Sequence, residues 1–176
     1  MKLLVVVDMQ NDFVTGAFNS PAAQAIVPNI VAKINEYKER GDKIVFTRDM
    51  HTAEDYANTY ESQLYPPHCF VGTWGWDYQE DIKNAVDWEN AKIYGKLAYG
   101  CAAYGRDLSD GLYDDMEEIE LCGVCTDCCV ISNSIVTRTF LPDVKITVDS
   151  KCCAGLTPEG HEMALKMMPI YQITVL

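Results

Sequence analysis

The sequence predicts an α/β protein in which six strands, mostly parallel, form one doubly wound, Rossmann-like sheet with helices on both faces. Two observations support this fold class. Short apolar runs alternate along the chain with segments whose apolar residues recur at helical spacing. The first run, residues 2–7, is rich in valine and lacks polar alternation, which is typical of a strand buried on both faces of a parallel sheet.

The other elements follow in chain order. Helical spacing extends from Ile26 to Tyr37 and ends at Gly41, and a later helix runs from Val130 to Phe140 before a proline. We expect further strands at residues 44–47, 91–95, 144–148 and 171–175, and one more that breaks at Gly123. Shorter helices are expected at residues 77–87, 112–117 and 159–168, and loops at 52–78, 101–111 and 149–158.

Length and charge limit the organisation and the partners. A chain of 176 residues is most simply one domain, here with a long loop region at about 49–78. The net charge of −12 argues against nucleic acid as a partner. No apolar run has transmembrane length and no signal peptide is evident, so we expect a cytoplasmic protein without membrane contact. Its eight cysteines are then reduced thiols.

The stretch at residues 120–140 is the most informative part of the chain. It predicts a strand, a tight turn and a helix, with Thr126 as the helix N-cap and Cys129 in the first helical turn. A thiol at that place faces unpaired N–H groups and the positive end of the helix dipole, which favour a thiolate nucleophile. Two alternatives remain: a buried cysteine that only packs, and an iron–sulfur ligand run formed by Cys122, Cys125 and Cys128.

Polar side chains follow other predicted strands. Asp8 comes directly after the first strand, where open α/β sheets build their sites. Lys96 follows the strand at 91–95 and would be an electrostatic partner for a thiolate. An Asp that caps the next turn and an ordinary surface lysine are the competing interpretations.

The loop region contains a set of metal-ligating residue types. Asp49, His51, Glu61 and His68 supply oxygen and nitrogen atoms suited to a divalent metal, Zn, Fe or Mn. Spacing alone does not show that these side chains converge, and a histidine in a loop is often only a hydrogen-bonding residue.

Five segments together resemble the isochorismatase-like cysteine hydrolases, and among them most closely the nicotinamidases. These segments are VDMQNDF at 7–13, TRDMH at 47–51, LYPPHCFVGT at 64–73, KLAYG at 96–100 and GVCTDCCV at 123–130. The resemblance covers nearly the whole chain. It implies a catalytic triad of Asp8, Lys96 and Cys129, and a cis peptide between Val124 and Cys125.

The resemblance also implies the rest of the site. The N–H groups of Cys125 and Cys129 would form an oxyanion hole, and Phe13 and Tyr65 would flank the substrate ring. Asp49, His51 and His68 match the family's metal ligands. No further histidine lies between His51 and His68, where some nicotinamidases have one, and Glu61 resembles the ligand of a subset that uses glutamate.

The implied reaction is the hydrolysis of nicotinamide to nicotinate and ammonia through a thioester on Cys129, with a divalent metal, by preference zinc, on the pyridine nitrogen. Because the metal ligands depart from the commonest pattern, a second hypothesis keeps the fold and changes the substrate to another small amide, a carbamoyl compound or a vinyl ether. A third hypothesis is a non-enzymatic iron–sulfur or redox protein. The expected partner is a small-molecule amide, and homo-oligomerisation stays open.

Overall fold

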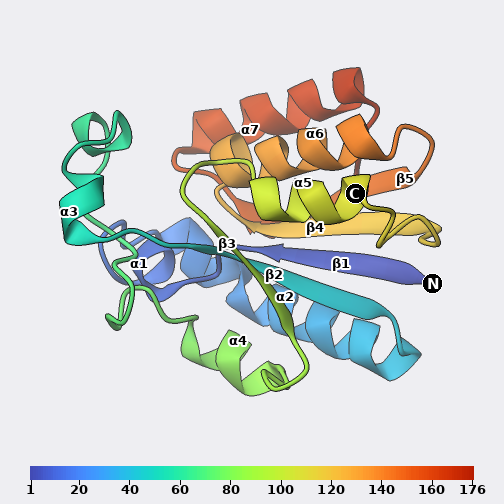
Figure 1. Ribbon diagram of the computed structural model, residues 1–176, viewed down its shortest axis with the longest axis horizontal. Coiled ribbons are helices and arrows are strands. Elements are labelled where there is room, and N and C mark those ends of the chain that lie inside the picture. The colour runs from blue at the N-terminus through green and yellow to red at the C-terminus, as the bar shows by residue number, and fades with distance from the viewer.

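Six parallel strands form one sheet in the computed structural model, which describes residues 1–176 (Figure 1). The strand order is β3-β2-β1-β4-β5-β6, so the chain starts near the middle and winds outward in both directions. This arrangement confirms the predicted fold class. The strands are β1 (Lys2–Val7), β2 (Lys43–Asp49), β3 (Lys92–Lys96), β4 (Glu118–Val124), β5 (Lys145–Ala154) and β6 (Thr174–Val175).

Helices lie on both sides of the sheet. In Figure 1, α2 (Pro21–Arg40) and α4 (Glu80–Ala85) lie below it, and α5 (Ala102–Ser109), α6 (Ile131–Phe140) and α7 (Pro158–Met167) lie above it. None of the helices is long and apolar enough to cross a bilayer. The remaining helical segments are α1 (Asn11–Val14), α3 (Ala53–Tyr56), the 3-10 turns η1 (Glu61–Gln63) and η3 (Met168–Tyr171), and the π-helical turn η2 (Thr126–Val130).

The local sequence determines where helix α2 begins and ends and which of its faces is buried. The Ser20 hydroxyl accepts the N–H of Ala23 at 3.1 Å, and Pro21 occupies the first turn, where no N–H is needed. Gly41 ends the helix in the left-handed region, at φ +71°, which glycine adopts without a steric cost. The face toward the sheet carries the buried residues Ala23, Ile26, Val27, Ile30, Ile34 and Tyr37.

The parallel register brings several strand ends to one edge of the sheet. Asp49 at the end of β2 lies beside Lys96 at the end of β3. Val7, the last residue of β1, pairs with Gly123 near the end of β4. The residues that follow these positions, Asp8 and the turn η2, therefore lie at the same edge.

Two predicted connections proved to be regular structure. Residues 101–111 were expected to be a loop, but they contain helix α5. Its start is held by α6, because the Asn133 side-chain oxygen accepts the N–H of Cys101 at 2.8 Å. Gly105 permits close packing, since a Cβ there would lie 3.1 Å from the Phe140 ring. Strand β5 also continues to Ala154, where a connector was expected, because it pairs with β4 up to the last residue of β4.

One predicted helix is absent. Residues 112–117 were expected to be helical, but they form turns. Gly111 adopts φ +80°, and the N–H of Glu117 donates to the carbonyl of Met1 at 3.0 Å. This hydrogen bond aligns the end of the segment with the start of β4, and the tertiary contact overrides the helix propensity of residues 112–117.

A buried polar network joins α2 to the sheet. The Tyr37 hydroxyl donates to Glu120 Oε2 at 2.7 Å. The Lys33 ammonium contacts the other Glu120 oxygen and also Asp149 Oδ2, the latter at 2.8 Å. Both Tyr37 and Glu120 are buried, so each group depends on the others for its hydrogen bonds.

We predict that Glu120→Ala lowers the free energy of unfolding by about 3 kcal/mol, because it leaves the Tyr37 hydroxyl and part of the Lys33 charge without a buried partner. Urea denaturation measures the change. Glu117→Ala is the matched control, since it removes an exposed pair with the N-terminal amine and should have little effect. Equal destabilisation by the two variants would contradict this account of the network.

Candidate active site

Three residues that the sequence singled out meet at the C-terminal edge of the sheet. The Lys96 ammonium lies 2.8 Å from Asp8 Oδ2 and 3.4 Å from the Cys129 sulfur. It also lies 3.1 Å from Asp49 Oδ1. All four side chains are buried. One cation therefore contacts two carboxylates and a thiol away from bulk water, where electrostatic interactions are strong.

The Asp8 carboxyl is held in place by a residue that sequence reasoning missed. The Thr47 hydroxyl donates to Asp8 Oδ1 at 2.6 Å. The other oxygen, Oδ2, lies 2.8 Å from the Lys96 ammonium, which is its one polar partner. Asp8 itself adopts φ +49°, a left-handed conformation that Asp tolerates better than most residues. Thr47 lies within a predicted strand and looks like an ordinary strand residue, so its position in the sequence gives no signal of this contact.

Burial sets the protonation of the acid and the thiol. It raises the pKa of Asp8, which makes the carboxylate a stronger base. It also raises the pKa of Cys129 well above the ordinary thiol value, and the Lys96 charge offsets only part of that effect. Burial opposes the charge of Lys96 as well, but Asp8, Cys129 and Asp49 together raise its pKa. Burial therefore opposes the effect of the helix terminus, which on its own would favour the thiolate.

Cys129, the candidate nucleophile, lies on a π-helical turn rather than in a regular first helical turn. The turn begins after a cis peptide between Val124 and Cys125, as the family resemblance implied. Cys125 occupies the N-cap position, and the expected cap, Thr126, instead pairs its hydroxyl with His161 Nδ1 at 2.8 Å. The Cys125 N–H makes no hydrogen bond within the protein, and Cys125 lines the same cavity as Cys129. Cys125 thus has a free N–H donor and lines the cavity that contains the sulfur.

The cysteines proposed as an iron–sulfur run are divided between two environments. Cys122 is fully buried within β4, where it lies near Cys152 and Cys153. Cys125 and Cys128 line the cavity that contains Cys129. This separation does not favour a shared cluster.

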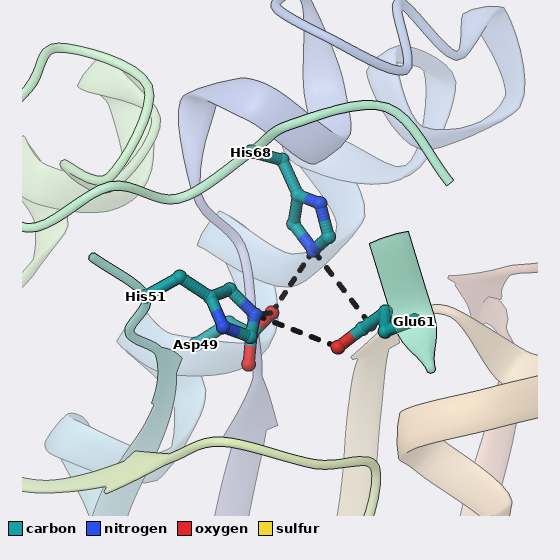
Figure 2. Close-up of side chains that lie close together, drawn as sticks. All are labelled: Asp49, His51, Glu61 and His68. Carbon is teal, nitrogen blue, oxygen red and sulfur yellow. Dashed lines mark hydrogen bonds and ion pairs between the residues drawn. The ribbon is translucent and has the colours of Figure 1, made fainter. Parts of the chain in front are cut away.

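Four side chains from the loop region converge beside the triad, as Figure 2 shows. One ligand atom from each of Asp49, His51, Glu61 and His68 lies within 4.8 Å of all the others. Asp49 Oδ2 lies 3.2 Å from Nε2 of each histidine. The Glu61 oxygens lie 3.6 and 3.8 Å from the same two nitrogens. Sequence spacing could not establish this convergence, and the structure brings all four together.

Surrounding groups orient these side chains in a way that fits a metal site. The His68 ring uses Nδ1 to bond the Pro66 carbonyl at 2.8 Å, so Nε2 is the nitrogen that faces Asp49 and Glu61. Gln10 fixes the Asp49 backbone by accepting its N–H at 2.7 Å and donating to its carbonyl at 2.9 Å. Burial would raise the pKa of Asp49, but its contacts with the histidines and Lys96 hold it below the ordinary value. Two nitrogen and two carboxylate ligands suit zinc, iron or manganese.

A small aromatic cavity lies between the candidate metal-ligating group, which is Asp49, His51, Glu61 and His68, and the Cys129 thiol. The predicted ring-binding residues Phe13 and Tyr65 both line it. Phe18 stacks on Phe13 at 5.2 Å between ring centroids and lies 6.0 Å from the Tyr65 ring. Sequence reasoning missed Phe18, because it lies in an aperiodic segment between two helices. The full lining is Phe13, Phe18, Asp49, Glu61, Tyr65, His68, Tyr99, Cys125, Cys128, Cys129 and Leu156.

Comparison with known proteins assigns the family. The model of the isochorismatase domain matches residues 2–176. The chain belongs to the isochorismatase family. Its relatives include a Mycobacterium tuberculosis protein named nicotinamidase/pyrazinamidase, 28% identical over 165 residues that cover 80% of this chain and 84% of the relative.

Solved structures of family members share the whole fold. The crystal structure of nicotinamidase/pyrazinamidase PncA from Bacillus subtilis superposes with a TM-score of 0.83 at 31% identity, covering 99% of this chain and 98% of that one. A pyrazinamidase of Pyrococcus horikoshii in complex with zinc superposes with a TM-score of 0.79 at 29% identity and with the same coverage.

We predict that Glu61→Gln weakens zinc binding by roughly tenfold to a hundredfold, because it replaces an anionic oxygen among the converging ligands with a neutral amide. Competition with a chromophoric chelator measures the affinity. Glu54→Gln is the control, since Glu54 is an exposed acid in the nearby helix α3 and lies outside the ligand group. Equal affinities of the two variants would show that Glu61 is not a ligand.

Proposed function

We propose that this protein is a cysteine amidohydrolase that converts nicotinamide to nicotinate and ammonia through a thioester on Cys129. The observation that carries the proposal is the position of Lys96, whose ammonium contacts Asp8 at 2.8 Å and the Cys129 sulfur at 3.4 Å. A base, a nucleophile and a cation between them are the parts that thiol-based hydrolysis requires. The names of the relatives support the choice of substrate.

The reaction begins with a proton transfer from the Cys129 thiol to Asp8. Burial disfavours the thiolate, so the sulfur needs a nearby base, and the raised pKa of Asp8 suits that role. Asp8 Oδ2 has the Lys96 ammonium as its one polar partner, which leaves a lone pair for the proton. Lys96 remains charged throughout and stabilises the negative charge as it moves from oxygen to sulfur.

The thiolate then attacks the carboxamide carbon, forming a carbon–sulfur bond while the carbonyl electrons move onto oxygen. The N–H groups of Cys125 and Cys129 stabilise this oxyanion, a contribution of about 3 kcal/mol for each donor by comparison with other hydrolases. Asp8 returns its proton to the amide nitrogen, the carbon–nitrogen bond breaks and ammonia leaves. The acyl group is then held on Cys129 as a thioester.

Water completes the cycle at the same carbon. Asp8 takes a proton from the attacking water, whose oxygen bonds to the acyl carbon. The carbon–sulfur bond breaks, the proton on Asp8 returns to the sulfur, and the acid leaves and gives its proton to solvent as nicotinate. The enzyme is restored with one water consumed and one ammonia released.

The substrate ring would lie between the metal-ligating group and the thiol. Asp49, His51, Glu61 and His68 would hold a divalent cation, zinc by preference and iron or manganese by the same ligand chemistry. When bound, the cation supplies a Lewis acid for the pyridine nitrogen and so orients the ring. Phe13, Phe18 and Tyr65 supply aromatic faces for stacking. Fixing the ring at one end places the carboxamide near the sulfur at the other.

We predict that Cys129→Ala abolishes ammonia release from nicotinamide, and that Asp8→Asn lowers kcat by about a hundredfold or more, because each removes a chemical step. A coupled ammonia assay measures both rates. Cys152→Ala is the control, since it removes a buried thiol of β5 that lies outside this cavity. Circular dichroism verifies that the variants fold.

Parental activity in Cys129→Ala would refute the nucleophile assignment. A panel of nicotinamide, pyrazinamide, a carbamoyl compound and a vinyl ether separates the proposal from the alternative substrates. Turnover confined to the last two compounds would replace nicotinamide as the substrate while leaving the triad in place.

A further inference from the structure

Leu156 lies at a junction of three adjoining cavities. It lines the catalytic cavity, a second cavity behind Phe13 and Phe18, and a third between the first turns of α2 and α7. The catalytic cavity measures about 20 Å³, the second about 180 Å³ and the third about 550 Å³. The catalytic and second cavities share four wall residues, which are Phe13, Phe18, Cys125 and Leu156.

The enclosed part of the catalytic cavity is narrow in this conformation. A volume of 20 Å³ accommodates about one water molecule, whereas a pyridine carboxamide needs several times that space. A wall side chain that turns aside would widen this enclosed part for the ring. The adjoining 180 Å³ provides the space into which a wall side chain can turn.

Leu156 is the wall residue best suited to move. Phe18 is held by ring contacts with Phe13, Tyr65 and His68. Cys125 is fixed by the backbone of the nucleophile turn, because its carbonyl accepts the N–H groups of Cys128 and Val130. The Leu156 side chain is only half-buried, and a change of rotamer displaces it without moving the backbone.

The backbone of Leu156 is fastened to the turn that carries the nucleophile. Its N–H donates to both carboxylate oxygens of Asp127, at 3.0 and 3.2 Å. Asp127 lies in η2, two residues before Cys129. The approach depends on Gly160, where a Cβ would lie 2.1 Å from Asp127 Oδ2. The hydrogen bonds to Asp127 thus fix the Leu156 backbone relative to Cys129, which lies two residues further along the same turn.

We propose that Leu156 is a specificity-determining residue, which rests on the proposed function. Its side chain separates the catalytic cavity from the second cavity and admits an unsubstituted aromatic carboxamide by turning aside. It excludes ring-alkylated carboxamides, because the alkyl group would occupy the space that the displaced side chain needs. Asp127 is a positioning residue that fixes the Leu156 backbone relative to Cys129.

The first test compares kcat/KM for nicotinamide with kcat/KM for a ring-methylated nicotinamide. The selectivity ratio is kcat/KM for the methylated substrate divided by kcat/KM for nicotinamide. Leu156→Ala should raise this ratio by about tenfold or more, the usual effect of one methyl group in a fitted apolar pocket. Leu156→Phe should lower the same ratio. Leu165→Ala is the matched control, since Leu165 is a half-buried leucine of α7 that lines none of the three cavities. Equal ratios in Leu156→Ala and Leu165→Ala would overturn the proposal.

The second test concerns the positioning residue. Asp127→Ala removes the acceptor for the Leu156 N–H and should raise the ratio of kcat/KM for the methylated substrate to kcat/KM for nicotinamide. Asp127→Asn keeps an acceptor oxygen and should show the parental ratio. A kcat that falls equally for both substrates in Asp127→Ala, with the ratio unchanged, would show that Asp127 has only a structural role.

Failure of the proposed function gives a different result. A parental protein inactive on nicotinamide refutes that function directly. The specificity test is then repeated with an aromatic carboxamide that the parental protein does hydrolyse and with its ring-methylated form. If Leu156→Ala leaves the ratio of the two kcat/KM values unchanged, the specificity role is overturned.

Discussion

The buried ammonium of Lys96 is the interaction on which the arrangement of this site depends. It contacts Asp8, Asp49 and the Cys129 sulfur, which come from the ends of three different strands or the turn after them. Each of these groups is costly to bury in its charged form, and a shared cation reduces the cost for all of them. The same ammonium also connects the thiol to the metal-ligating group, because Asp49 contacts both Lys96 and the two histidines.

Two features of the sheet bring these groups to one ammonium: the register of its parallel strands and the close approach of the β1 and β4 backbones. Parallel pairing places Asp49 beside Lys96 and ends β1 beside Gly123 of β4. At Gly123 a Cβ would lie 2.1 Å from the Val7 carbonyl, and φ is +116°, so glycine is required there. The chain can then leave β4 into the cis peptide and the π-helical turn. Cys129 is thereby brought over the end of β1, toward Asp8.

Much of this could be predicted from sequence, for identifiable reasons. The valine-rich β1 and the capped helix α2 carry strong local signals, and the polar residues at the strand ends indicated the edge of the sheet. Helix α5 was missed because contacts with Asn133 and Phe140 of α6 stabilise it, and its own sequence contains a glycine. Thr47, Phe18 and Leu156 could not be assigned roles, since each acts through neighbours distant in the chain. The burial that raises the pKa of Cys129 is a property of the folded molecule and has no local signal in the sequence.

The central claim is that the Lys96 ammonium favours ionisation of the Cys129 thiol, and the rate at which iodoacetamide alkylates Cys129 tests it most directly. The measurement is made in a Cys128→Ala background, with peptide mass spectrometry to locate the label, and with Lys166→Met as a control for loss of an exposed lysine. The account predicts that Lys96→Met slows alkylation by about tenfold or more at neutral pH, since a rise of one unit in the thiol pKa lowers the thiolate fraction tenfold. Equal rates in folded Lys96→Met and Lys166→Met proteins would contradict it.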